Sequence, residues 1–213
     1  MRTFSNKCPN PNHPKKGSTI KVEPIRDKKS IQKLKDLLAD KPRDYCLFTL
    51  GINTAYRANE LVSIKVGQVA HLKVGDRLDV KQSKNGKYRS VTVNNNAVSA
   101  IQACLAIHPS PTPDAPLFFS YTTGRALQSN TVSKYMKGWC NQIGIFGNFA
   151  SHTMRKTWGY HIYRNNHLIT PSLTQTNIAE LMIAYGHATE RQTLEYLCIQ
   201  DHDISSLYLG MEL

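Results

Sequence analysis

Long apolar segments are missing from this chain of 213 residues. No run of apolar residues is long enough to span a bilayer, and residues 1–7 (MRTFSNK) contain no apolar signal segment. These absences argue against a membrane-spanning or secreted protein. We therefore expect a cytoplasmic protein without a membrane partner.

Cysteines and metal-binding patterns are also scarce. The five cysteines are scattered, and none belongs to a Cys-x-x-Cys pair: Cys8, Cys46, Cys104, Cys140 and Cys198. Such a set indicates neither a disulfide framework nor a zinc ribbon. The sequence also lacks a His-x-x-x-His pair and a carboxylate cluster, which argues against a metal-dependent nuclease. We expect no metal and no cofactor.

Acidic residues are few compared with basic ones. The 27 Lys and Arg against 15 Asp and Glu leave a formal net charge of +12, which attracts polyanions such as nucleic acid. Residues 1–43 alone carry 12 basic and 4 acidic side chains. We interpret residues 1–20, which are rich in Pro, Asn and Lys, as a basic irregular leader. Such a leader can be an ordinary solvated segment or an arm that binds nucleic acid.

Helical periodicity dominates the rest of the chain. In residues 30–39 the apolar side chains recur at helical spacing, and residues 43–53 are apolar nearly all round, as in a buried central helix. Ser151 can cap a helix, and Gly186 can end one. The pattern predicts helices over 30–39, 43–53, a short stretch after Thr54, 96–107, 129–143, a stretch after Ser151, 177–184 and a stretch from Thr189.

One segment has the two-residue period of strands instead. Leu78 and Val80 precede the turn Ser83-Lys84-Asn85-Gly86-Lys87, and Val91 and Val93 follow it. Asn-Gly between two alternating runs predicts a β-hairpin, because both residues tolerate positive φ. The sequence therefore predicts a mainly α fold with a small antiparallel β-sheet (α+β). Residues 165–176 suggest an inserted surface loop.

Four separated motifs carry residues that can bind phosphate or transfer protons. Thr54-Ala55-Tyr56-Arg57-Ala58-Asn59-Glu60-Leu61 contains Arg-x-x-Glu-Leu, and Lys84 lies in the hairpin turn. In Ser-His-Thr-Met-Arg-Lys-Thr, His152 and Arg155 are spaced i,i+3 and share a helix face. Gly186-His187 precedes Tyr196. In this order the set resembles the active site of the tyrosine recombinase (phage integrase) family: Arg57, Lys84, His152, Arg155, His187 and Tyr196.

This resemblance implies a catalytic domain over residues 21–199 and a role for each site residue. Tyr196 would attack a DNA phosphodiester, forming a 3′-phosphotyrosyl bond and releasing a 5′-hydroxyl, so that rejoining needs no ATP. Arg57 and Arg155 would hold the non-bridging oxygens by forked hydrogen bonds, and Glu60 would orient Arg57. Taken singly, the tyrosine can be a core residue and the arginines can belong to buried salt bridges.

The remaining roles are proton transfer and positioning. Lys84 would be the general acid for the leaving 5′ oxygen, with Lys87 as its closest rival and a solvated turn lysine as the plain alternative. His152 would accept a proton or donate to the phosphate, unless it is a structural residue at the helix start. His187 would donate one hydrogen bond to the phosphate.

The resemblance also implies partners and leaves alternatives open. We expect double-stranded DNA as substrate, and a C-terminal helical tail at 200–213 that docks on a neighbouring protomer or packs within the chain. Family members usually carry a DNA-clamping domain before the catalytic one, whereas here the resemblance begins at about Val22. A site-specific recombinase is therefore weighed against a type IB topoisomerase and a non-catalytic DNA-binding remnant.

Overall fold

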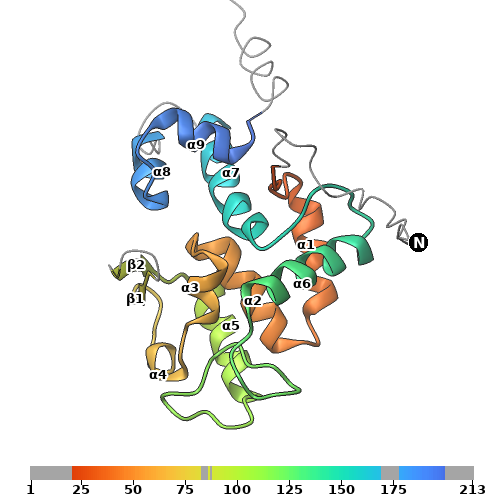
Figure 1. Ribbon diagram of the computed structural model, residues 1–213, viewed down its shortest axis with the longest axis vertical. Coiled ribbons are helices and arrows are strands. Elements are labelled where there is room, and N and C mark those ends of the chain that lie inside the picture. Colours follow the sequence, from red (N-terminus) through yellow and green to blue (C-terminus); the bar gives the residue numbers. More distant parts are fainter. Residues whose placement is uncertain (1–20, 83–85, 87, 169–177, 200–213) are drawn as a thin grey trace, which may run out of the picture.

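The computed structural model describes residues 21–82, 86, 88–168 and 178–199 (Figure 1). The predicted leader at 1–20, the hairpin residues Lys84 and Lys87, and the predicted tail at 200–213 lie outside these residues. Of the predicted loop at 165–176, residues 165–168 are helical, so that part of the prediction is wrong, and 169–176 lie outside the described residues.

The described chain is mostly helical and contains a two-stranded antiparallel sheet, which confirms the predicted fold class. Of its helices, the single turn α4 was not foreseen, because four residues are too few to show a period. The elements are α1 (Lys28–Leu38), α2 (Pro42–Thr54), α3 (Ala58–Val62), α4 (Val66–Val69), β1 (Arg77–Lys81), β2 (Tyr88–Thr92), α5 (Asn95–Ala106), α6 (Ser129–Gln142), α7 (His152–Leu168), α8 (Ile178–Tyr185) and α9 (Glu190–Leu197).

Polar side chains define where several helices begin. The carboxylate of Asp27 accepts hydrogen bonds from two backbone amides at the start of α1, and Asn94 caps α5 through the amide of Ala97. Thr189 caps α9 by accepting from the amide of Gln192. Helix α2 begins with Pro42, whose fixed φ suits the first turn.

The main core surrounds α2. Helices α5 and α7 pack against it, and its side chains Cys46, Leu47, Phe48 and Leu50 are fully buried. Gly51 allows the close approach of α7, because a Cβ at this position would overlap the side chain of Met154. Buried apolar surface of this extent provides most of the free energy that holds the domain together.

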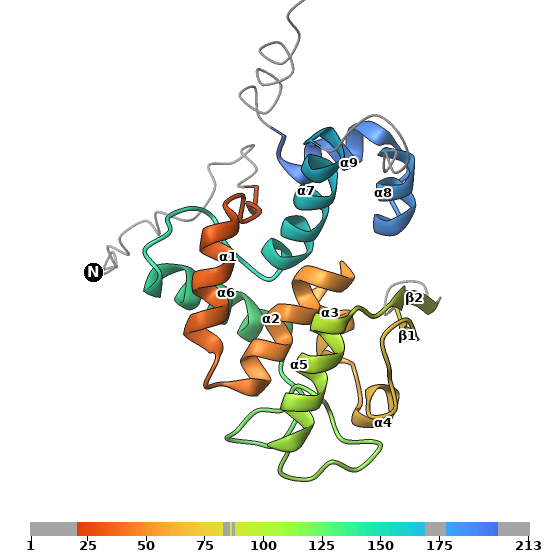
Figure 2. The ribbon, with the colours of Figure 1, turned by 180° about the vertical axis from the view of Figure 1, so that it is seen from behind.

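A second, smaller core lies between α7, α8 and α9. Its buried members are Ala55, Leu181, Tyr185 and Leu197, and Tyr196 packs against them partly buried. Helices α7, α8 and α9 lie together on one side of α2, whereas α5 and the hairpin lie on the other, in both views (Figures 1 and 2). The second core therefore brings α9 to the end of α2 at Ala55.

The hairpin is tied to the segment that follows α2. Strands β1 and β2 pair with Leu78 opposite Val91 and Val80 opposite Arg89. The hydroxyl of Tyr56 donates to the carbonyl oxygen of Leu78 at 2.5 Å and lies 3.1 Å from that of Arg89. Both strands are thus fixed beside Arg57, the next residue after Tyr56. In the part of the chain described, no helix has the length and apolar character needed to cross a bilayer.

Candidate active site

Arg57 is the N-cap residue of α3 and is oriented by Glu60. The backbone amide of Arg57 donates to Oε2 of Glu60 at 2.7 Å, and its Nη1 donates to Oε1 at 2.9 Å. The Glu60 side chain is 3 % exposed, whereas that of Arg57 is 41 % exposed. A buried carboxylate therefore holds a guanidinium group that belongs to a partly exposed side chain.

Arg155 connects the two cores from α7. It is 2 % exposed, and its guanidinium donates to the carbonyl oxygen of Ala55 through Nη1 and to that of Tyr185 through Nη2 at 2.8 Å. Ala55 ends α2 in the left-handed conformation, with φ +53°, and this turn aims its carbonyl at Arg155. Burial, followed by the charge of Arg57, lowers the pKa of Arg155.

Tyr196 lies on α9 against the second core. Its ring centroid is 5.0 Å from that of Tyr185 and 5.1 Å from that of His187, and its hydroxyl lies 3.2 Å from Nδ1 of His152. Burial raises the pKa of the phenol, while the charge of Arg155 and a hydrogen bond from it lower the pKa, as do the charges of Arg57 and Arg89. The phenol is thus packed but remains in contact with the charged groups.

Both histidines are held as neutral imidazoles. His152 is the first residue of α7, with part of its ring exposed; the surrounding protein and then the charges of Arg155, Lys156 and Arg57 lower its pKa. Burial, and then the charges of Arg155 and Arg57, lower the pKa of His187 to about 4. Near neutral pH both rings are therefore uncharged, and each has one nitrogen that carries a proton and one that does not.

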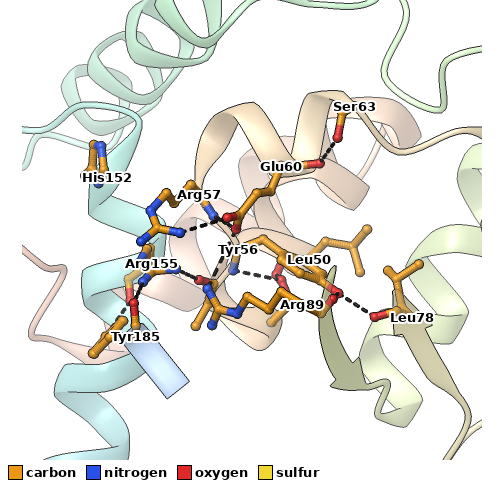
Figure 3. A network of polar contacts seen from close by, with 12 residues as sticks. Leu50, Tyr56, Arg57, Glu60, Ser63, Leu78, Arg89, His152, Arg155 and Tyr185 are labelled. Carbon is orange, nitrogen blue, oxygen red and sulfur yellow. Dashed lines mark hydrogen bonds and ion pairs between the residues drawn. The ribbon is translucent and has the colours of Figure 1, made fainter. Parts of the chain in front are cut away.

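The fold thus brings Arg57, His152, Arg155, His187 and Tyr196 to one place, where α3, α7 and α9 meet. Figure 3 shows Arg57 between Glu60 and the α7 residues His152 and Arg155. Lys84 and its rival Lys87 lie outside the described residues, so their distances to this cluster are not defined.

Two cations of the cluster were not foreseen from the sequence. Arg89 on β2 lies 3.7 Å from Oε2 of Glu60. Nζ of Lys156 lies 4.7 Å from the Tyr196 ring centroid and 3.2 Å from Sγ of Cys198. Lys156 carried a usable signal, because its i,i+4 spacing from His152 puts both on one helix face. Arg89 carried none, since it is one of several basic residues in the hairpin.

A helical domain of this topology has the architecture of a tyrosine recombinase catalytic domain. The sequence pattern of the Phage integrase family matches residues 26–201. The chain therefore belongs to the phage integrase family, as its motifs indicated.

Similar proteins differ in length from one another. The probable integrase/recombinase YoeC of Bacillus subtilis (strain 168) is 28% identical over 188 residues, which cover 88% of this chain and 95% of that protein. The tyrosine recombinase XerC of Haemophilus ducreyi is 24% identical over 185 residues, which cover 85% of this chain but 57% of XerC. The chain thus spans nearly all of one relative and little more than half of the other.

Solved structures share the fold at low sequence identity. The XerA recombinase superposes with a TM-score of 0.71 at 18% identity, covering 92% of this chain and 66% of that one. The XerH recombinase bound to palindromic difH substrate superposes with a TM-score of 0.67 at 18% identity, covering 90% of this chain and 53% of that one.

Proposed function

We propose that this protein is a site-specific DNA recombinase that breaks and rejoins strands through a covalent 3′-phosphotyrosyl intermediate. The observation that carries the proposal is the contact of the Tyr196 hydroxyl with Nδ1 of His152, beside the guanidinium groups of Arg155 and Arg57. The names of the related recombinases support it, as do neighbouring structures of XerH on its difH substrate and of a lambda integrase dimer on a COC′ core site.

The first step is attack by Tyr196. Because burial raises the pKa of its phenol, the hydroxyl keeps its proton in the absence of DNA, and neutral His152 accepts that proton through Nδ1 during the attack. A bond forms between Oη of Tyr196 and phosphorus while the bond from phosphorus to the 5′ oxygen breaks. One phosphoester replaces another, so the reverse attack by a 5′-hydroxyl rejoins the strand without ATP.

The charge that builds up on the phosphate is offset by the arginines. Arg57 offers its partly exposed side chain to a non-bridging oxygen, and the buried Arg155 adds positive charge where water does not screen it. Nδ1 of His187 lies 3.1 Å from the hydroxyl of Thr193. The Thr193 hydroxyl also lies 3.4 Å from the carbonyl oxygen of Thr189, to which it can donate its one proton instead. In the proposed active form the hydroxyl donates to Nδ1 of His187, so that Nε2 carries the ring proton and donates a hydrogen bond to the phosphate. The positive charges of Arg57 and Arg155 stabilise the phosphate as metal ions do in metal-dependent nucleases, so the proposed step is metal-independent.

The roles assigned to the other parts of the chain belong to the same proposal. Double-stranded DNA is the substrate, and the net charge of +12 favours its binding. Residues 21–199 form the catalytic domain, residues 1–20 form a basic leader, and residues 200–213 dock on a neighbouring protomer in a homo-oligomer on DNA. Lys84 supplies the proton to the leaving 5′ oxygen.

Covalent trapping on DNA tests the function. The wild-type chain, incubated with nicked duplexes from the flanks of its gene, is expected to form a protein–DNA adduct that survives denaturation and a strong chelator. Tyr196→Phe removes the nucleophilic oxygen and is expected to reduce the adduct to background while leaving DNA binding intact. Tyr121→Phe, at an exposed tyrosine in another part of the chain, is the matched control and retains the adduct.

Each alternative function predicts a different result. An adduct that persists in Tyr196→Phe, or that requires magnesium, contradicts the mechanism. Specific DNA binding without an adduct under any condition favours the non-catalytic remnant. Relaxation of supercoiled plasmid without sequence preference favours the topoisomerase.

The general acid can be identified by changing the leaving group. Replacing the bridging 5′ oxygen with sulfur gives a thiolate that leaves without a proton, so this substrate is expected to restore cleavage by Lys84→Ala. The rate of adduct formation on the oxygen and sulfur substrates is compared for Lys84→Ala and Lys87→Ala. Rescue of Lys87→Ala, with no rescue of Lys84→Ala, would assign the acid to Lys87.

A further inference from the structure

Arg89 projects from β2 toward the carboxylate that orients Arg57. Its side chain is 12 % exposed, and its Nη1 lies 3.7 Å from Oε2 of Glu60, the oxygen that also accepts from the amide of Arg57. Within the described residues this Nη1 has no hydrogen-bond partner. The guanidinium carbon lies 5.5 Å from the ring centroid of Tyr56, which holds the group in place (Figure 3).

The local balance of charge is unusual for a buried site. In the described part of the chain, the guanidinium groups of Arg57 and Arg89 form ion pairs with the carboxylate of Glu60 alone. The guanidinium group of Arg155 forms no ion pair there, although the charge of Glu60 acts on it. Burial, and then the charge of Arg155, lowers the pKa of Arg89 to about 10, so Arg89 stays charged near neutral pH. Two of these three guanidinium groups, those of Arg89 and Arg155, are largely buried, and such an excess of positive charge is costly unless an anion completes it.

We propose that Arg89 is a positioning residue of the phosphate site: it holds Oε2 of Glu60, so that Glu60 keeps Arg57 in place, and it adds a third guanidinium charge to those of Arg57 and Arg155. This inference rests on the proposed function, in which the missing anion is the phosphate of DNA. Arg89 acts by holding Glu60 and by the electrostatic effect of its positive charge on the site.

Other charged and titratable groups face the Tyr196 phenol from every neighbouring element. Helix α7 contributes His152, Arg155 and Lys156, α8 contributes Tyr185, and His187 precedes α9; Arg57 acts from the start of α3. Because Arg155 and Arg57 remain when Arg89 is replaced, the pKa of the Tyr196 phenol is expected to rise, while its reactivity is not lost.

A titration without DNA tests the inference. In the full chain, 3-fluorotyrosine is placed at position 196 and the pH midpoint of its ¹⁹F signal is followed by NMR. Arg89→Met keeps the packing on Tyr56 but removes the charge, so its midpoint is expected to move to higher pH. Arg89→Lys keeps the charge and is expected to stay close to wild type. Arg77, the other hairpin arginine, contacts Ser90 rather than Glu60. Arg77→Met is therefore expected to leave the midpoint unchanged.

Three results would overturn the inference: a midpoint in Arg89→Met that equals the wild-type value, an equal shift in Arg77→Met, or a shift in Arg89→Lys as large as in Arg89→Met. Thermal unfolding checks that the variants fold. If Arg89→Met does not fold, Arg89→Gln takes its place, because it removes the same charge.

A kinetic readout then links the residue to the reaction. At neutral pH, Arg89→Met is expected to form the covalent adduct roughly tenfold more slowly than wild type, with the loss reduced at higher pH. A purely structural role predicts a loss that does not depend on pH, and that result would contradict the inference. The titration needs no DNA, so a failure of the recombinase proposal and a failure of this inference are separable.

Discussion

At the residue scale, burial and positive charge act in opposite directions on the phenol of Tyr196. Burial raises its pKa, and the charges of Arg155, Arg57 and Arg89 lower it. For His152 and His187 both influences favour the neutral form, because burial and nearby cations each disfavour a positive charge on the imidazole ring. The site thus holds a protonated phenol beside neutral imidazoles, which is the arrangement that proton transfer from Tyr196 requires.

The depressed pKa of His187 predicts a pH dependence of stability. In the unfolded chain this histidine takes up a proton near its ordinary value of 6.5, and in the folded chain only near 4. Between these values the unfolded state binds more protons, so the free energy of unfolding is expected to fall as the pH falls from about 6.5 to about 4.

Urea denaturation between pH 8 and pH 4 measures this dependence. His187→Asn is expected to flatten part of the slope, because it removes the linked proton, while His152 and His161 still contribute. The exposed His71 provides the control, and His71→Asn is expected to keep the wild-type slope. A slope that is the same in His187→Asn and wild type would contradict the prediction.

At the scale of elements, the position of Tyr196 depends on how α9 is held. A helix of eight residues is marginal in isolation, so its place is set by packing on α7 and α8. The end of α9 is also tied to the N-terminal segment: Arg26 donates to the carbonyl oxygen of Cys198 at 3.1 Å, and Sγ of Cys198 lies 3.5 Å from that of Val22. Tyr196 is therefore positioned by segments far apart in the sequence.

Two glycines in helices separate the effect of tight packing on stability from the effect of helix propensity. At Gly159 on α7 an added Cβ would overlap the hydroxyl of Tyr185, which donates to the carbonyl oxygen of Arg155 at 2.9 Å. Gly159→Ala is expected to lower the free energy of unfolding by about 1–3 kcal/mol, as overpacking does. At Gly138 on α6 nothing lies near an added Cβ, so Gly138→Ala is expected to raise it by up to about 1 kcal/mol.

Urea denaturation gives both stabilities, and covalent trapping shows whether Gly159→Ala also disturbs the site. Because Tyr185 packs against Tyr196 and His187, the adduct is expected to form more slowly in this variant. If Gly159→Ala is as stable as Gly138→Ala, the contact between α7 and α8 is looser than we infer.

At the scale of the whole molecule, the charge is distributed unevenly. Residues 1–20 contain four basic residues and no acidic one: Arg2, Lys7, Lys15 and Lys16. Each Lys or Arg that contacts a phosphate releases counterions and makes binding to duplex DNA more sensitive to salt. If these side chains contact DNA, residues 1–20 increase affinity without taking part in chemistry.

Removal of residues 1–20 is expected to lower the slope of log affinity against log salt by up to about 4, close to one for each basic residue. Fluorescence anisotropy with a DNA duplex measures the slope at several salt concentrations. Ending the chain after Ile199 removes no Lys or Arg and serves as the control. An unchanged slope without the leader would show that these side chains do not contact DNA.

Most elements were predictable because their signals are local. The apolar spacing of residues 30–39, the cap at Thr189 and the Asn-Gly turn each act within a few residues along the chain. The family motifs were recognisable for the same reason. The continuation of α7 to Leu168 was not foreseen, because residues 165–168 (NNHL) carry little helical signal of their own.

The sequence by itself determined most of the segments that form helices and strands, the family that the chain belongs to, and the order of its candidate site residues, because these depend on short-range patterns. The tertiary structure alone decided that Arg89 shares Glu60 with Arg57, that Lys156 lies beside the Tyr196 ring, and that both histidines are neutral. Burial and Coulomb interactions depend on distance in space, and the order of residues along the chain does not specify that distance.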